Sequence, residues 1–246
     1  MEPFFRQQYT VSPNHVDRYG RVKPSALLYF AQEAAGGHCA LLELDWETLA
    51  KRNLFWAVIR YRVQILRLPR AGETITVETW PMPTTRSAFP RATVAYDAQG
   101  CEVFRAISLW VLMDRTSRAM VLPGKSGVDL TGTLRGCELA PPSSIVPKAL
   151  ENTAICRVGY TELDRNGHMN NTRYMDWIDD LLPSDFHKQH PVKEFTLCYL
   201  SEATEGQQVS LDWQLTEDGC LQVNAHREKT DVSGGRERVF AAQVSF

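Results

Sequence analysis

The densest group of polar side chains in the chain lies between residues 164 and 172, where the sequence reads Asp-Arg-Asn-Gly-His-Met-Asn-Asn-Thr. In an extended loop, Asp164, Asn166 and His168 fall on alternate positions and therefore project to one side. They supply a carboxylate, an amide and an imidazole, which are groups that general acid–base chemistry uses. The spacing predicts a site that can hold a carbonyl compound and activate a water molecule.

The same loop leads directly into a predicted helix, Thr172–Leu182. The first backbone N–H groups of a helix lack partners within it and carry partial positive charge. Asn170, Asn171 and Thr172 occupy this position. We therefore expect their amides to polarise a bound carbonyl and to hold the oxyanion that forms during acyl transfer.

Two other interpretations of this loop involve no catalysis. Runs of Asp and Asn before a helix commonly form caps and turns, which alone would account for the motif. The spacing of Asp164, Asn166 and His168 also imitates the start of an EF-hand calcium loop. Its sixth position is Met169 rather than Gly and its twelfth is Met175 rather than Glu, which excludes an EF-hand. The motif alone therefore leaves two interpretations open, a structural turn and a catalytic loop.

The periodicity of apolar residues predicts two helices, each followed by a set of strands. The helices are Ser25–Leu44 and Thr172–Leu182. Gly36-Gly37 lowers the helix propensity of the first, and a surface packed tightly against these glycines would explain them. The strands are 55–66, 74–80, 90–96 and 102–113 in the first set and 192–200, 208–215, 221–229 and 238–246 in the second.

This order of elements indicates an internal duplication. Residues 17–20, Asp-Arg-Tyr-Gly, match residues 164–167, Asp-Arg-Asn-Gly, at an offset of 147 (164 minus 17). Further along the chain, residues 68–73 match residues 202–207 at an offset of 134 (202 minus 68). The first repeat has Arg21 where the second has His168. The shared Asp-Arg-x-Gly is therefore expected to be architectural, and the histidine is what the second repeat adds.

A long helix wrapped by a curved antiparallel sheet is the hot-dog fold, so the chain is predicted to be α+β, a tandem hot dog. The first repeat spans residues 1–121, a linker rich in Gly and Pro spans 122–150, and the second repeat spans 151–246. Two unrelated α+β domains of similar size are the alternative.

Composition excludes several classes of protein. The 246 residues carry a formal charge of −2, which argues against a dedicated nucleic-acid binder. The longest apolar run, Ala26–Ala31, is far shorter than the roughly 20 residues of a membrane helix. The N-terminus lacks the organisation of a signal peptide, and the six cysteines form no CxxC or other metal-ligand spacing. We therefore expect a soluble cytoplasmic protein with scattered buried thiols and no metal.

The residues of the loop and helix also resemble the signature of the acyl-acyl-carrier-protein (acyl-ACP) thioesterases. The matching residues are Asp164, Asn166, His168, Asn170, Asn171, Tyr174 and Trp177, and the segments 55–58, 72–80 and 199–202 are similar to further parts of the family. The resemblance implies a tandem hot dog without cofactor or metal. It also implies hydrolysis of the thioester between a fatty acyl chain and acyl-carrier protein, an acidic partner, which releases free fatty acid and ends fatty acid synthesis. A homodimer is compatible with it.

The resemblance assigns roles to particular residues. Asp164, Asn166 and His168 match the family's motif residues, and Glu202 matches its distal catalytic carboxylate. Plant members have a cysteine directly after this glutamate, whereas this chain has Ala203. This difference favours direct attack on the thioester by a water molecule, promoted by Glu202 and His168, over a mechanism with an acyl-enzyme intermediate. The plant-type transit peptide is also missing, which favours a bacterial cytoplasmic enzyme over a plastid one.

The first repeat has Leu68 at the position of Glu202, so we expect an active site in the second repeat alone and acyl-chain binding in the first. Aromatic side chains could line the chain-binding tunnel or simply form the core: Tyr29, Phe30, Trp56, Trp80 and Trp110. We expect His38 to be packed and hydrogen-bonded. Arginines that could meet the acidic partner are Arg60, Arg62, Arg67, Arg70, Arg165 and Arg173. A coenzyme A thioesterase and a non-catalytic acyl-binding protein are the alternative functions.

Overall fold

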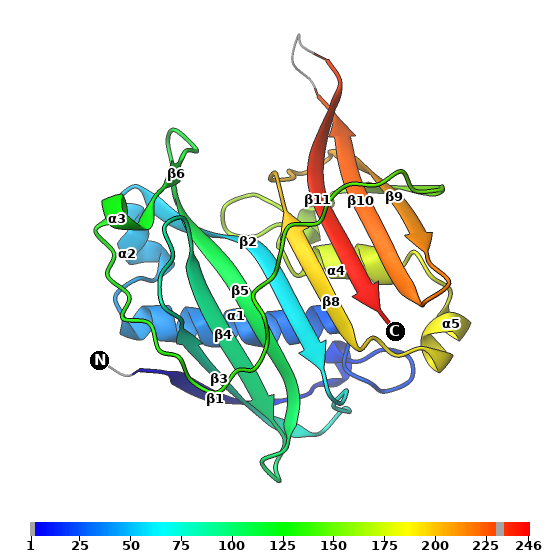
Figure 1. Ribbon diagram of the computed structural model, residues 1–246, viewed down its shortest axis with the longest axis horizontal. Helices are drawn as coiled ribbons and strands as arrows, with labels where there is room; N and C mark the ends of the chain where they lie inside the picture. Colours follow the sequence, from blue (N-terminus) through cyan, green and yellow to red (C-terminus); the bar gives the residue numbers. More distant parts are fainter. Residues whose placement is uncertain (1–2, 230–233) are drawn as a thin grey trace. The chain divides into compact units, whose positions relative to one another are not determined.

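In the computed structural model, which describes residues 3–229 and 234–246, the chain forms two units, Met1–Pro142 and Ser143–Phe246. The first unit contains an antiparallel sheet in the order β1-β3-β4-β5-β2, with the short β6 paired to β5. Helix α1 lies against this sheet and contacts β1 and β3 (Figure 1). The elements of this unit are β1 (Phe5–Thr10), the 3-10 helix η1 (Pro13–His15), α1 (Pro24–Leu41), α2 (Trp46–Lys51), β2 (Leu54–Ile65), β3 (Thr74–Pro81), β4 (Phe89–Tyr96), β5 (Glu102–Asp114), β6 (Met120–Val121) and α3 (Pro123–Ser126).

Helix α1 supplies much of the core of the first unit. Leu27, Phe30 and Ala34 recur at helical spacing and are fully buried. The expectation about the glycine pair is confirmed for Gly37, because a Cβ there would lie 2.6 Å from the ring of Phe5 on β1. It is wrong for its neighbour Gly36, where a Cβ would meet no atom within 4 Å. The close approach of β1 thus explains why the helix has a glycine at position 37, although glycine weakens helix formation.

The segment that the sequence predicts to be a linker, 122–150, does more than connect the repeats. Val128, Leu130 and Leu139 in this segment are buried in the apolar clusters of the first unit. Arg135 lies over the ring of Phe4 at 3.9 Å. The Gly- and Pro-rich composition of the segment excludes long helices and strands but does not prevent its side chains from packing. The segment as far as Pro142 belongs to the first unit.

The second unit repeats the architecture of the first. Its antiparallel sheet has the order β7-β9-β10-β11-β8, in which each strand corresponds to one strand of β1-β3-β4-β5-β2. Helix α4 takes the place of α1 (Figure 1). The elements of this unit are β7 (Asn152–Arg157), the 3-10 helix η2 (Tyr160–Glu162), α4 (Arg173–Asp179), α5 (Ser184–Gln189), β8 (Glu194–Tyr199), β9 (Gln208–Leu215), β10 (Cys220–Glu228) and β11 (Arg236–Ser245).

The eight predicted strands correspond to β2–β5 and β8–β11, with ends that differ by at most two residues. The second helix is shorter than predicted, since α4 has 7 residues and ends at Asp179. Pro183 disfavours helical geometry at Leu182, so the last residues form a turn instead. The part of the chain that the structure describes contains no helix of the length and apolar character needed to span a membrane.

The duplication extends to individual hydrogen bonds. In the first unit the amide of Val22 donates to the carbonyl of Pro69 at 2.8 Å, and in the second the amide of Met169 donates to the carbonyl of Ala203, also at 2.8 Å. These bonds make Val22 equivalent to Met169, at an offset of 147, and Pro69 equivalent to Ala203, at an offset of 134. Both offsets are the ones found in the sequence. Leu68 and Glu202 are therefore equivalent positions, as predicted.

Candidate active site

The predicted loop of the second repeat is a tight turn organised by Asp164. Its Oδ1 accepts hydrogen bonds from the amides of Asn166 at 2.7 Å and His168 at 3.2 Å, and its own amide donates to the carbonyl of His168 at 2.7 Å. Gly167 adopts a φ of +78°, a conformation that favours glycine. The structure thus supports the loop-shaping role expected for Asp164, which places Asn166 and His168 on a fixed backbone.

The first repeat builds the same turn without the same chemistry. Asp17 Oδ1 accepts from the amides of Tyr19 at 2.8 Å and Arg21 at 3.0 Å, and Gly20 has a φ of +73°. The guanidinium of Arg21 then donates twice to Asp17 Oδ2, at 3.0 and 2.9 Å. The prediction that Asp-Arg-x-Gly is architectural is therefore confirmed. In the first repeat an arginine, and not an imidazole, ends the turn.

Tertiary structure brings together the two side chains with the strongest catalytic potential. His168 Nε2 lies 3.4 Å from Glu202 Oε2, although 34 residues separate them (202 minus 168). A β-bridge between His168 and Thr204 holds the two segments side by side. The imidazole is 19% exposed and the carboxylate 41%, so water reaches both. An acid–base pair open to solvent can activate a water molecule and pass on its proton.

The predicted oxyanion site at the helix start requires a correction. The amide of Asn170 donates to the carbonyl of Glu162 at 2.8 Å, and the amide of Thr172 donates to Asn170 Oδ1 at 3.0 Å. Both N–H groups are occupied by these local caps, so the prediction that they bind a substrate carbonyl is wrong. The side-chain Nδ2 of Asn171 is buried and has no hydrogen-bond partner among the residues that the structure describes, and the oxyanion role of Asn171 stays a prediction.

Two further residues support this site: Tyr174, which is part of the sequence motif, and Arg227, which is not. Tyr174 on α4 packs edge-on against Tyr199 and Phe240, with ring centroids 5.5 and 4.8 Å away. Burial raises the pKa of Tyr174 well above its usual value, so this hydroxyl stays neutral. Arg227 on β10 donates to the carbonyl of Glu202 at 2.5 Å. No local sequence pattern links Arg227 to the loop.

The thiols take no part in a disulfide, and their burial varies. Cys198 on β8 is buried, as expected, but Cys101 is exposed, so the expectation of buried thiols is wrong for that residue. Its position in the turn between β4 and β5 explains the difference. The expectation for His38 is confirmed: this side chain is fully buried, and its Nδ1 lies 3.2 Å from Nη1 of the buried Arg91.

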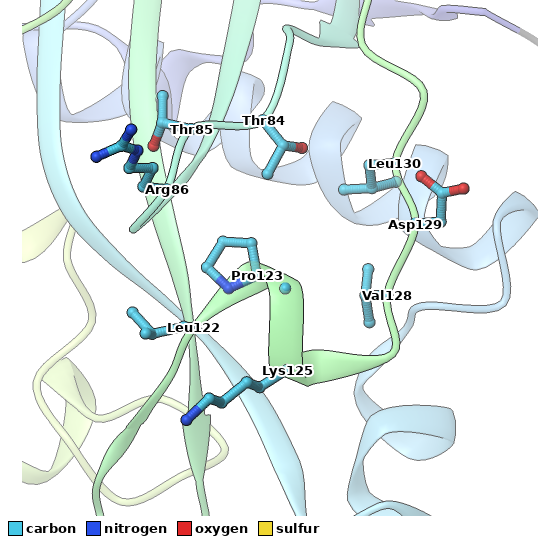
Figure 2. Close-up of a pocket in the computed structure, with 10 residues that line it drawn as sticks. Thr84, Thr85, Arg86, Leu122, Pro123, Lys125, Val128, Asp129 and Leu130 are labelled. Atoms are coloured by element: carbon cyan, nitrogen blue, oxygen red, sulfur yellow. The ribbon is translucent and has the colours of Figure 1, made fainter.

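The first unit also has a surface pocket with a volume of about 690 Å³. Figure 2 shows it between the loop that carries Thr84–Arg86 and the segment Leu122–Leu130. None of the aromatic residues predicted for an acyl tunnel lines it. Two of them, Phe30 and Trp80, are buried core residues. Binding of the acyl chain in the first repeat stays a prediction.

Two family models together match most of the chain: the N-terminal domain of acyl-ACP thioesterases matches residues 2–122, and the C-terminal domain matches residues 147–241. This chain belongs to the acyl-ACP thioesterase family. Its fold agrees with a crystal structure of an acyl-ACP thioesterase from Bacteroides thetaiotaomicron, with a TM-score of 0.88 and 25% identity over 99% of this chain and 98% of that one. The tandem hot-dog prediction is confirmed.

Curated acyl-ACP thioesterases are similar over most of this chain. The chloroplastic palmitoyl-acyl carrier protein thioesterase of Gossypium hirsutum is 26% identical over 213 residues, covering 80% of this chain and 52% of that protein. The chloroplastic dodecanoyl-[acyl-carrier-protein] hydrolase of Umbellularia californica is 29% identical over 215 residues, covering 81% and 56%. The chain spans about half the length of the curated relatives it matches. The catalytic roles of Asp164, Asn166, His168 and Glu202 stay predictions for this chain.

Proposed function

We propose that the protein hydrolyses the thioester of fatty acyl-ACP, releasing free fatty acid and holo-ACP and so ending fatty acid synthesis. One observation carries this proposal: His168 and Glu202, 3.4 Å apart, lie in the second repeat of a chain that matches both domains of the acyl-ACP thioesterase family. The first repeat, with Arg21 and Leu68 at these positions, is the non-catalytic half.

The proposed reaction uses water as the nucleophile. Glu202, alone or through His168, accepts a proton as the water oxygen bonds to the thioester carbonyl carbon. Asn166 is the candidate donor to the oxygen that becomes negative. The C–S bond then breaks, and the same acid–base pair returns the proton to the departing thiolate. General acid–base catalysis of this kind raises the reaction rate about 10²- to 10⁴-fold, and loss of an oxyanion donor lowers kcat about 10²- to 10³-fold.

Steady-state hydrolysis of acyl-ACP and acyl-CoA at matched chain length tests the function. We expect kcat/KM to be higher for acyl-ACP than for acyl-CoA, and both activities to require Glu202. A higher kcat/KM for acyl-CoA would indicate a coenzyme A thioesterase. Tight binding of acyl-ACP without release of fatty acid would indicate an acyl-binding protein.

Recognition of the acidic partner requires a local basic surface, because the chain as a whole carries a formal charge of −2. Two of the predicted arginines already have carboxylate partners. Arg67 lies 2.8 Å from Glu73 and also pairs with Asp97, and Arg173 lies 3.2 Å from Asp176. These pairs reduce the attraction that Arg67 and Arg173 offer. We propose that the contact relies more on other arginines of the predicted set, such as Arg60 and Arg70.

Raising the ionic strength is expected to lower kcat/KM for acyl-ACP about tenfold, while kcat/KM for an uncharged acyl-N-acetylcysteamine thioester changes less than about twofold. The reason is that the screening length falls from roughly 10 Å at 0.1 M salt to roughly 3 Å at 1 M. Initial rates for both substrates across a sodium chloride series measure the difference. Equal salt sensitivity of the two substrates contradicts electrostatic recognition.

A further inference from the structure

The turn that carries Glu202 is held at three consecutive residues. The carbonyl of Glu202 accepts from Arg227 Nη1 at 2.5 Å, and the carbonyl of Ala203 accepts from the amide of Met169 at 2.8 Å. The amide of Thr204 donates to Gln207 Oε1 at 3.0 Å. The backbone of this turn is therefore fixed, and the side chain of Glu202 that it carries is 41% exposed.

Arg227 connects two of these anchors. Its Nη1 also donates to Gln207 Oε1 at 2.6 Å, so one guanidinium nitrogen supports both the Glu202 carbonyl and the side chain that caps Thr204. Glu237 on β11 accepts from the other side of the guanidinium, at 3.0 Å from Nε and 2.9 Å from Nη2. Only 17% of the Arg227 side chain is exposed. A planar guanidinium held in this way has a defined position, which a flexible ammonium group would lack.

We infer that Arg227 is a positioning residue for Glu202: it fixes the backbone from which the carboxylate reaches His168. This inference rests on the proposed function. A carboxylate that is exposed to solvent relies on its backbone for placement, and a displacement of about 1 Å in a reacting group can cost about 10²-fold in rate. Arg227 Nη1 donates to the carbonyl of Glu202, so the inferred effect passes through the backbone that carries the carboxylate.

The first repeat provides a natural control. Its equivalent turn is held by Glu73, whose Oε1 accepts from the amide of Arg70 at 2.8 Å, as Gln207 accepts from Thr204. Leu68 occupies the position of Glu202, so this turn has no carboxylate to place. Loosening the two turns is therefore expected to have similar effects on folding and different effects on turnover.

The test compares Arg227→Met, Arg227→Lys and Glu73→Ala with the full-length wild type, using the uncharged acyl-N-acetylcysteamine thioester. We expect Arg227→Met to lower kcat about 10- to 100-fold with KM within about twofold. Arg227→Lys keeps one donor and is expected to recover part of the loss. Glu73→Ala is expected to leave kcat unchanged. Thermal unfolding of each variant separates lost folding from lost turnover.

A double-mutant cycle shows whether Arg227 acts through Glu202. Once Glu202→Gln has removed the carboxylate, Arg227→Met is expected to cause less than about a twofold further loss, because the two residues act as a unit. The inference would be overturned if the losses of kcat in the two single variants multiplied in the double variant. It would also be overturned if Arg227→Met had the kcat of the wild type.

A readout without substrate separates this inference from the proposed function. Glu202→Gln is expected to shift the imidazole NMR resonances of His168, and Arg227→Met is expected to reproduce that shift. An unchanged His168 spectrum in Arg227→Met overturns the inference, whether or not the wild type hydrolyses thioesters. A wild type that hydrolyses no thioester contradicts the proposed function alone.

Discussion

Replacing His168 with alanine is expected to lower kcat/KM for acyl-ACP by about 10²- to 10⁴-fold, whereas Arg21→Ala is expected to leave it within about threefold of wild type. The two residues end equivalent turns, yet His168 lies 3.4 Å from Glu202, a carboxylate outside its own turn, whereas Arg21 is paired with Asp17 of its own turn. An imidazole can take and return a proton near neutral pH, whereas an arginine stays charged.

Arg21→Ala also serves as the structural control for this comparison. It removes the guanidinium that donates to Asp17 and that lies 5.0 Å from the ring of Tyr19, so some loss of stability is expected. Thermal unfolding and initial rates measured on the same preparations distinguish the two effects. The assignment of the active site to the second repeat fails if a folded Arg21→Ala loses as much activity as His168→Ala.

Glu202→Gln is expected to lower kcat about 10²- to 10⁴-fold, because the amide keeps the shape of the side chain but cannot accept the proton of water. Glu205→Gln is the matched control: Glu205 lies in the same turn, is exposed and carries the same charge. We expect its kcat to be within about twofold of wild type. Equal losses in the two variants would indicate a general effect of charge on this surface.

Cys198→Ala is expected to retain activity, since water and not a thiol is the nucleophile in the proposed mechanism. Ala203 stands where plant members have a cysteine. Cys198 lies on β8, which ends at Tyr199, before the turn that carries Glu202. Cys198 is also buried on β8. Quench-flow followed by intact-protein mass spectrometry is expected to show no acyl adduct. A trapped thioester on the protein, or a loss beyond about a hundredfold in a folded Cys198→Ala, would falsify this mechanism.

The sequence alone predicted the tandem architecture and most of the secondary structure. The alternation of apolar residues in the eight predicted strands, β2–β5 and β8–β11, is local information, and it located their ends within two residues. Strands β1 and β7 were not predicted, since most of their side chains are exposed. The short elements β6, α2, α3 and α5 were also not predicted, because a few residues provide too little periodicity. The turn around Asp164 was also encoded locally, since an aspartate followed three residues later by glycine forms the same hydrogen bonds in both repeats.

Tertiary structure decided how the site is assembled. Resemblance to a family assigned Glu202 its role, but its place beside His168 depends on a bridge between segments that no local pattern connects. Arg227 reaches the same turn from β10 for the same reason. The helix-start amides of Asn170 and Thr172 looked available in the sequence, yet folding supplied them with acceptors at Glu162 and Asn170. Whether a buried polar group is free for substrate depends on every partner that the fold brings within hydrogen-bonding distance, and many of those partners are distant in sequence.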